Sequence, residues 1–180
     1  DNLHSGNKAN IPDGVNFIEM DICDKRIIDV FEKNKFDAVV HLAAQTMVNA
    51  SIDDPIYDSD NNIRGTINIL EACRKTGVRR IIFSSTAAVY GDVNAVPVLE
   101  DFTTDPLSFY GLSKLTVEKY LKLYQKLYGL EYVILRYANV YGERQGDGGE
   151  GGVISIFMKL LAQNKALTIH GDGKQSRDFV

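Results

Sequence analysis

Tyr110 and Lys114 stand four positions apart in the stretch SFYGLSK, residues 108–114. A free tyrosine titrates near about 10, so it is a poor base at neutral pH. An ammonium group nearby stabilises the phenolate and lowers the tyrosine pKa. On a helix, residues four apart lie one turn apart on the same face. The two side chains can therefore form an acid/base couple that exchanges a proton with an alcohol.

The same spacing also fits two ordinary residues on a helix surface, because the chain has 9 tyrosines and short motifs recur by chance. The surrounding residues distinguish the two interpretations. A run of hydroxyls, Ser84, Ser85 and Thr86, comes about two dozen residues earlier. A hydroxyl can hydrogen-bond a reacting oxygen and hold a substrate in line. Oxidation of an alcohol by a nicotinamide needs both parts, since a hydride leaves carbon while a proton leaves oxygen.

The elements that must position these residues alternate along the chain. Apolar runs predict strands at 15–22, 36–44 and 78–87, a strand that leaves into a loop at 131–142, and a short strand and turn at 167–173. Apolar residues at helical spacing predict helices at 24–35, 55–75, 108–128 and 153–165. Asp24 can cap the first of these helices, and Gly77 and Gly129 can end two others. The alternation predicts an α/β fold of the Rossmann-like type, a doubly wound parallel sheet with helices on both faces.

In such a sheet, ligands bind beyond the carboxyl ends of the strands. The segments that follow predicted strands are 21–22, 41–46, 84–91 and 137–142. Small residues such as Ala43 and Ala44 let the backbone approach a flat ligand closely. Tyr110 opens the helix that follows the hydroxyl run. This convergence of several segments is more specific than the tyrosine–lysine spacing alone.

Composition sets the broad class. With 180 residues, 44% of them hydrophobic, the chain suits one domain or one domain and a piece of another. The net charge of -4 and the lack of a basic patch argue against nucleic-acid binding, and no apolar run reaches membrane-spanning length. Cys23 and Cys73 lack metal-type spacing and are interpreted as free thiols, which favours a cytoplasmic protein without a metal site.

Three motifs together carry a family resemblance: FSSTAAVYG, the Tyr-x-x-x-Lys pair, and LRYANVYG. They resemble the extended short-chain dehydrogenase/reductase superfamily, in particular its NAD-dependent nucleotide-sugar epimerases and dehydratases. The UDP-glucose 4-epimerases are the best-matching subgroup, and the likeness covers essentially the whole chain. It implies NAD as cofactor, a UDP-sugar substrate, 4-epimerisation of a UDP-hexose through a 4-keto sugar, and a place in galactose metabolism.

The resemblance also implies site residues. The catalytic ones are Thr86, Tyr110 and Lys114. The cofactor-binding ones are Asp1, Asn2, Asp21, Ile22, Leu42, Ala43, Ala44, Asn62, Ser84, Tyr110, Lys114 and Tyr137. Asp1 corresponds to the acid on the adenosine ribose, which favours NAD over NADP. The substrate-binding ones are Thr86, Tyr110, Asn139, Val153 and Arg177, the last as a grip on the diphosphate.

The chain departs from the family pattern at its start, where the family has a strand and a GxxGxxG turn that cradles the pyrophosphate. We therefore expect 1–142 to be a partial NAD-binding Rossmann domain without the first strand and glycine loop. Residues 143–180 are then the start of the substrate-binding region, and the chain is a fragment whose own activity is an open question. The glycine-rich run 146–152 fits either a lid or a plain flexible connection.

Several alternatives stay open at this point. Dehydratases of the superfamily carry an acid shortly after the catalytic hydroxyl, whereas Ala87 and Ala88 follow Thr86 here, and this favours an epimerase. Another nucleotide-sugar dehydratase, reductase or epimerase is the first alternative, and a non-catalytic nucleotide-binding module is the second. The hexose can be glucose, N-acetylglucosamine or glucuronate. Family enzymes often pair through two helices, here those around 55–75 and 108–128, which predicts a homodimer.

Overall fold

The computed structural model describes residues 1–93, 96–145 and 152–180. Most of the glycine-rich run 146–152 lies outside the described residues, so both interpretations of it stay predictions. The chain divides into two compact units, one of Asp1–Asn2 with Ile18–Tyr137 and one of Leu3–Phe17 with Ala138–Val180. The first unit carries the sheet and the tyrosine–lysine pair.

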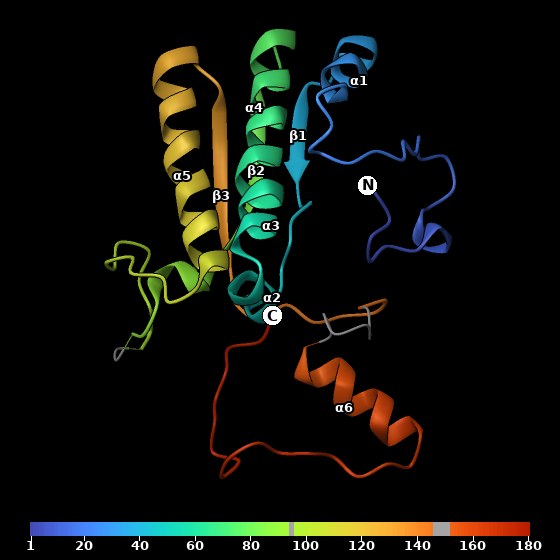
Figure 1. Ribbon diagram of the computed structural model, residues 1–180, viewed down its shortest axis with the longest axis vertical. Helices are drawn as coiled ribbons and strands as arrows, with labels where there is room; N and C mark the ends of the chain where they lie inside the picture. Colours follow the sequence, from blue (N-terminus) through green and yellow to red (C-terminus); the bar gives the residue numbers. More distant parts are fainter. Residues whose placement is uncertain (94–95, 146–151) are drawn as a thin grey trace. The chain divides into compact units, whose positions relative to one another are not determined.

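The first unit is built on a parallel sheet of three strands in the order β1-β2-β3 (Figure 1). The strands are β1 (Ala38–His41), β2 (Arg80–Thr86) and β3 (Glu131–Tyr137). In register, Ala38 faces Arg80 across the first ladder, and Thr86 faces Tyr137 across the second. This parallel arrangement with intervening helices confirms the predicted Rossmann-like class.

The helices that pack on this sheet are α1 (Ile27–Asn34), α4 (Gly65–Thr76) and α5 (Phe109–Tyr128). They share one hydrophobic core and so cover the same face of the sheet. The expected second layer of helices is not seen in the described part of the first unit. The physical reason is that strands laid down in one direction by right-handed crossovers place every connecting helix on one side.

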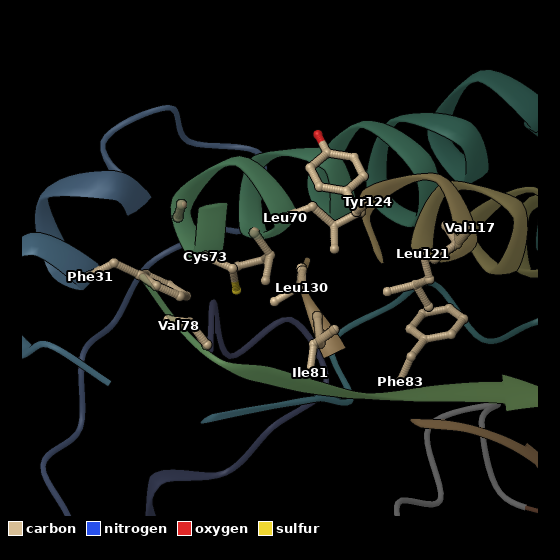
Figure 2. Packing of buried hydrophobic residues seen from close by; sticks show 12 residues of the cluster. Phe31, Leu70, Cys73, Val78, Ile81, Phe83, Val117, Leu121, Tyr124 and Leu130 are labelled. Atoms are coloured by element: carbon tan, nitrogen blue, oxygen red, sulfur yellow. The ribbon is translucent and has the colours of Figure 1, made fainter. Parts of the chain in front are cut away.

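The core lies between β2 and this layer of helices, as Figure 2 shows. Leu70, Ile81 and Leu121 are completely buried there, and Phe83 is 1% exposed. Full burial of such side chains stabilises a fold by about 1.5–3 kcal/mol each. On the opposite face of the sheet, Val40 is 61% exposed. The core is therefore one-sided within this unit.

Local signals set the ends of α5 as the sequence predicts. The Ser108 side chain accepts a hydrogen bond from Gly111 N at 3.1 Å, which caps the first turn. Gly129 ends the helix with φ of 74°, a left-handed conformation that suits glycine. Gly77 ends α4 in the same way, with φ of 76°.

The helix predicted at 55–75 is interrupted. It divides into α3 (Pro55–Ser59), a π-helical turn η2 (Asp60–Arg64) and α4. A short helix that the sequence did not predict, α2 (Val48–Asp53), precedes it. The break between α2 and α3 comes from Asp54, whose side chain caps Tyr57 N at 2.9 Å just before Pro55.

Two predicted strands are wrong, because a strand needs a paired neighbour. Residues 15–22 form no strand. Their backbone makes two hydrogen bonds with Asp1: Asp1 N donates to Ile18 O at 3.4 Å, and Met20 N donates to Asp1 O at 3.0 Å. Of the short strand and turn predicted at 167–173, the turn is present at 171–173 and the strand is not. The helix predicted from residue 24 begins at Ile27, because Asp24 first closes a turn with Arg26 N at 2.9 Å.

The remaining elements are short. They are the 3-10 turns η1 (Lys8–Asn10) and η3 (Ala87–Tyr90), and helix α6 (Val153–Ala162). In the second unit, Asn139 bridges to Phe179, whose ring meets Tyr141 edge to face. None of the described helices combines the length and the apolar character that crossing a membrane requires.

Candidate active site

Lys114 lies on the buried side of α5, where its side chain reaches the carboxyl-terminal part of β2. It is 3% exposed, and its Nζ donates a hydrogen bond to Ser84 O at 3.0 Å. The same Nζ lies 5.0 Å from the Phe83 ring centroid. Burial lowers the pKa of Lys114 to about 8, although the charge of Asp58 acts in the opposite direction. The ammonium is therefore close to losing its proton in the mildly alkaline range.

Tyr110 lies in the first turn of α5, half-buried, with its ring centroid 5.9 Å from Lys114 Nζ. The structure thus brings the two residues together on one helix face. Burial raises the pKa of the Tyr110 phenol, hydrogen bonding with Thr86 opposes the rise, and the charge of Asp58 adds to it. The expected lowering of the Tyr110 pKa by Lys114 is not found: the pKa is raised, and the charge of Lys114 is not among the causes.

Thr86 is the last residue of β2 and is half-buried. Its Oγ1 accepts a hydrogen bond from Ala88 N at 3.1 Å and so caps the turn η3. The same hydroxyl interacts with Tyr110. Thr86 therefore combines a capping role with a place beside the candidate base.

Behind the pair lies a buried polar network that the sequence interpretation reached only at Asn62. This side chain is 2% exposed, and its Oδ1 accepts from Gln45 N at 2.8 Å. Its Nδ2 donates to Gln45 O at 3.0 Å, to Asp58 Oδ1 at 3.0 Å and to Ser113 Oγ at 3.1 Å. Asn62 thus ties the π turn to the strand end after β1 and to α5. A contact between Asn62 and a cofactor stays a prediction.

His41 closes the other side of the network. Its Nε2 lies 2.9 Å from Thr66 Oγ1, and Thr66 donates its own hydroxyl proton to Asn62 O at 2.6 Å. Because the Thr66 hydroxyl already donates its proton to Asn62 O, His41 Nε2 donates the hydrogen bond to Thr66 Oγ1. Burial lowers the pKa of His41 to about 3, so the imidazole is neutral. His41 is therefore a buried, hydrogen-bonded residue that does not titrate near neutral pH.

The positions predicted to bind a cofactor differ in their surroundings. Asp21 accepts hydrogen bonds from Cys23 N at 2.7 Å and from Asn2 Nδ2 at 2.8 Å, which hold its pKa below the ordinary value. Ile22 is half-buried beside it. Asp1 is exposed and bonds to the backbone at Ile18. These residues lie together in the first unit, and their contact with a cofactor stays a prediction.

After β1, Leu42 is 62% exposed, Ala43 is exposed and Ala44 is half-buried. Ser84 offers Lys114 its carbonyl, and Tyr137 ends β3 in register with Thr86. These positions therefore lie at strand ends of one sheet. Whether they contact a cofactor stays a prediction.

The remaining predicted substrate residues belong to the second unit. Asn139 Nδ2 donates to Asp178 O at 2.9 Å, so it is held by the segment that follows Arg177. Arg177 is exposed, and its Nη1 donates to Ser176 O at 2.8 Å. Val153 is the first residue of α6 and is 43% exposed. Their roles toward a substrate stay predictions.

A second buried cluster was missed by sequence reasoning. Glu118 is 1% exposed and accepts from Ser85 Oγ at 2.6 Å and from Arg136 Nη2 at 2.7 Å. Arg136 Nη1 also donates to Tyr90 Oη at 2.7 Å and to Glu100 O at 3.0 Å. The available signal was the place of Glu118, four residues after Lys114 on the same face of a predicted helix. Among the residues that the structure describes, no group of His, Cys, Asp or Glu side chains is arranged to hold a metal ion.

Known proteins resemble the chain along its whole length. The sequence model of the NAD-dependent epimerase/dehydratase family matches residues 1–180. A Methanocaldococcus jannaschii protein is 51% identical over 181 residues, which cover 100% of this chain and 59% of that protein. The chain thus spans about three-fifths of the length of that relative.

Two solved structures show the same likeness in three dimensions. The UDP-glucose 4-epimerase of Thermotoga maritima, crystallised with UDP-glucose, superposes with a TM-score of 0.97 at 40% identity, covering 100% of this chain and 59% of that one. The Thermus thermophilus UDP-glucose 4-epimerase in complex with NAD superposes with a TM-score of 0.94 at 39% identity, covering 100% of this chain and 60% of that one. This chain belongs to the NAD-dependent epimerase/dehydratase family.

Proposed function

We propose that the chain serves NAD-dependent 4-epimerisation of a UDP-hexose, with UDP-glucose and UDP-galactose as the first pair to test. The observation that carries the proposal is the meeting of Tyr110, Lys114 and Thr86 at the carboxyl end of the sheet. The chain has this arrangement in a fold that matches UDP-glucose 4-epimerases over its full length. We assign 1–142 to the cofactor-binding part and 143–180 to the start of the substrate-binding part.

The residues assigned to NAD suit such a ligand. Leu42 and Ala43 expose apolar surface and backbone just beyond β1. Asp21 is an ionised carboxylate already paired with Asn2, beside the exposed Asp1. We therefore assign the cofactor to the edge formed by these segments, with Lys114 and Tyr137 at its far end. Bound there, NAD supplies a group that can take a hydride from C4 of the hexose and return it.

The chain's own residues handle the proton. Tyr110 accepts the proton of the C4 hydroxyl and gives one back to the 4-keto oxygen when hydride returns to the opposite face. Lys114 supplies positive charge behind the ring, which favours the phenolate at the moment of transfer. Thr86 hydrogen-bonds the reacting oxygen and keeps it in line with Tyr110. Asn139, Val153 and Arg177 are assigned to the UDP-sugar, with Arg177 on the diphosphate.

The direct test follows UDP-glucose by proton NMR with added NAD. The samples are this chain and a chimera that carries the flanking segments of the Thermotoga maritima relative at both ends. We expect UDP-galactose from the chimera, and its loss in the Tyr110→Phe chimera. No UDP-galactose from a chimera that demonstrably binds NAD would contradict UDP-glucose as the substrate.

The same assay separates the alternatives. UDP-N-acetylglucosamine and UDP-glucuronate replace UDP-glucose to identify the hexose, and a 4-keto product that leaves the enzyme would indicate a dehydratase. Ala87 and Ala88, where dehydratases carry an acid after the hydroxyl, favour the epimerase. Full biological activity of the Tyr110→Phe protein would favour the non-catalytic nucleotide-binding module.

We also propose a homodimer formed through the helices around 55–75 and 108–128. Apolar side chains remain exposed on them: Ile56 is 73% exposed, Leu123 53% and Leu127 63%. Contact between two copies would bury this surface. Sedimentation of the Leu123→Glu variant tests the proposed dimer. The control is Lys122→Glu, an exposed change that leaves the apolar surface intact. We expect only Leu123→Glu to yield monomers. A cytoplasmic location stays a prediction for a fluorescent fusion to check.

A further inference from the structure

Asp58 is a buried acid on α3 that neither the motifs nor the proposed mechanism uses. Its side chain is 1% exposed. Oδ1 accepts hydrogen bonds from Gln45 Nε2 at 2.8 Å and from Asn62 Nδ2 at 3.0 Å. Within the described residues, Oδ2 has no hydrogen-bond partner. A buried carboxylate with one unpaired oxygen is costly, so its presence calls for a physical reason.

The reason lies in Lys114. The two charges act on each other through space, without a direct ion pair in the described part of the chain. Asp58 is the acid whose charge acts to raise the pKa of Lys114. Burial raises the pKa of Asp58, while hydrogen bonding with Ser113 and Gln45 and, to a smaller extent, the charge of Lys114 act against that rise. The acid and the ammonium, both buried, therefore act as each other's counter-charge.

The other charged or titratable groups around Lys114 do not replace Asp58. His41, on β1, is neutral, as shown above, and Tyr110, on α5, is a phenol. Glu118, one turn further along α5, is occupied by Arg136 Nη2 at 2.7 Å. Among the described residues, Asp58 is thus the buried acid near the candidate acid/base pair that makes no direct ion pair.

Asp58 also acts through hydrogen bonds on the position of α5. Asn62 donates both to Asp58 and to Ser113, the residue before Lys114. Gln45 bonds to Asp58 and anchors the segment after β1, through its bond to Met47 O at 3.0 Å. The carboxylate therefore joins the segment after β1 to Asn62 in the π turn, and Asn62 in turn bonds to Ser113 on α5.

We propose that Asp58 is a positioning residue for the Tyr110–Lys114 pair: its carboxylate holds Asn62 and Gln45 against α5 and supplies the buried negative charge that balances the Lys114 ammonium. This inference rests on the proposed function and deepens it. The charge of Asp58 acts directly to raise the pKa of Tyr110, so its contribution to the pair runs through Lys114. Without the charge, burial favours neutral Lys114, and a neutral amine no longer supports the Tyr110 phenolate.

The test uses Asp58→Asn in this chain, because asparagine keeps an acceptor for Gln45 and Asn62 and removes only the charge. Asp60→Asn is the matched control, an acid two residues on that is 47% exposed and paired with Arg64. Lysine labelled with ¹³C at Cε reports the titration of Lys114, assigned by the loss of its signal in Lys114→Arg. We expect Asp58→Asn to lower the Lys114 midpoint by about one pH unit, as removal of a nearby opposite charge does. An equal midpoint in Asp58→Asn and Asp60→Asn would overturn the proposal.

A measurement on the unmutated chain keeps the proposal testable if Asp58→Asn fails to fold. Carboxyl ¹³C signals show whether Asp58 is ionised while Lys114 is still protonated. We expect an ionised Asp58 throughout the Lys114 titration. A carboxyl group that stays protonated up to the Lys114 midpoint would overturn the proposal without any variant.

The chimera described above adds a kinetic reading. We expect Asp58→Asn to move the alkaline limb of kcat downward by about one pH unit with little change in KM, because a counter-charge acts on protonation rather than on binding. An unchanged alkaline limb in an active Asp58→Asn chimera would contradict the proposal. If the chimera shows no epimerase activity, the proposed function fails, while the Lys114 titration still decides the role of Asp58.

Discussion

Two buried acids, Glu118 on α5 itself and Asp58 on α3, are used in opposite ways. Glu118 meets Arg136 through two bonds, at 3.0 Å to Oε1 and 2.7 Å to Oε2, and also accepts from Ser85. Asp58 meets no cation directly and keeps one oxygen without a partner among the described residues. The cation of the first pair keeps its proton, since hydrogen bonding to Glu118 raises the pKa of Arg136. The cation opposite Asp58 has its pKa lowered to about 8.

The difference separates structure from chemistry. A fully paired cluster fixes geometry, because every polar group loses a partner if any element moves. An incompletely paired site holds its charges near the point of protonation change, which is what acid/base chemistry needs. The Glu118 cluster therefore sets the frame of β2, β3 and α5, and the Asp58 site sets the proton affinity inside it.

The largest expected effect comes from breaking the paired cluster. Glu118→Gln leaves the Arg136 guanidinium, which is 20% exposed, without a counter-charge. We expect the free energy of unfolding to fall by about 3 kcal/mol, the low end for a broken buried pair. Urea unfolding followed by circular dichroism measures it.

The control for that change is Glu131→Gln, whose partner Arg80 is 46% exposed. Because solvent screens such a pair, its loss should cost less than about 1 kcal/mol. Equal losses in the two variants would show that the Glu118 cluster gains nothing from burial.

A pH-dependent difference should mark the second region. The folded pKa of Lys114, about 8, lies below its ordinary value of 10.5, so the unfolded chain binds more protons between these values. The burial penalty is thus fully present below pH 8 and disappears as pH rises toward 10.5. Relative to Lys114→Met, the free energy of unfolding of the unmutated chain should rise by on the order of 2 kcal/mol across this window.

Urea titrations at several pH values between 7.5 and 10.5 test this expectation. The Glu118→Gln variant should keep a constant deficit over the same window, because Arg136 does not titrate there. A Lys114→Met difference that is flat with pH would place the Lys114 pKa near its ordinary value and remove the contrast between the two regions.

Among the buried groups of the two regions, the smallest effect is expected at Thr86, which follows Ser85 of the paired cluster and interacts with Tyr110 of the titrating site. Thr86→Val loses the hydroxyl that caps Ala88 N at 3.1 Å. Loss of such a cap costs about 1 kcal/mol of unfolding free energy. Thermal unfolding should show this loss in Thr86→Val and recovery in Thr86→Ser. Epimerase activity of the chimera should fall in Thr86→Val and recover in Thr86→Ser. Activity that survives Thr86→Val would limit the role of Thr86 to capping the turn η3.

Much of the frame follows from local chemistry. The helix Phe109–Tyr128 begins one residue after the predicted start, where Ser108 caps it, and ends where Gly129 predicts, because caps act within one turn. The strands around Val39, Ile81 and Ile134 follow from apolar runs. The strands predicted at 15–22 and 167–173 failed, because an apolar run gives a tendency and pairing requires a neighbour.

The sequence by itself determined that Tyr110 and Lys114 share a helix face, since a four-residue spacing does so wherever the helix lies. The tertiary structure decided which distant groups meet that face. Asp58 lies 56 positions before Lys114 (114 minus 58), and its charge acts on Lys114 only because packing brings α3 and α5 together. Whether an acid pairs, titrates or stays neutral depends on burial and on the partners that packing brings within reach. These quantities come from long-range packing, which a single sequence does not display.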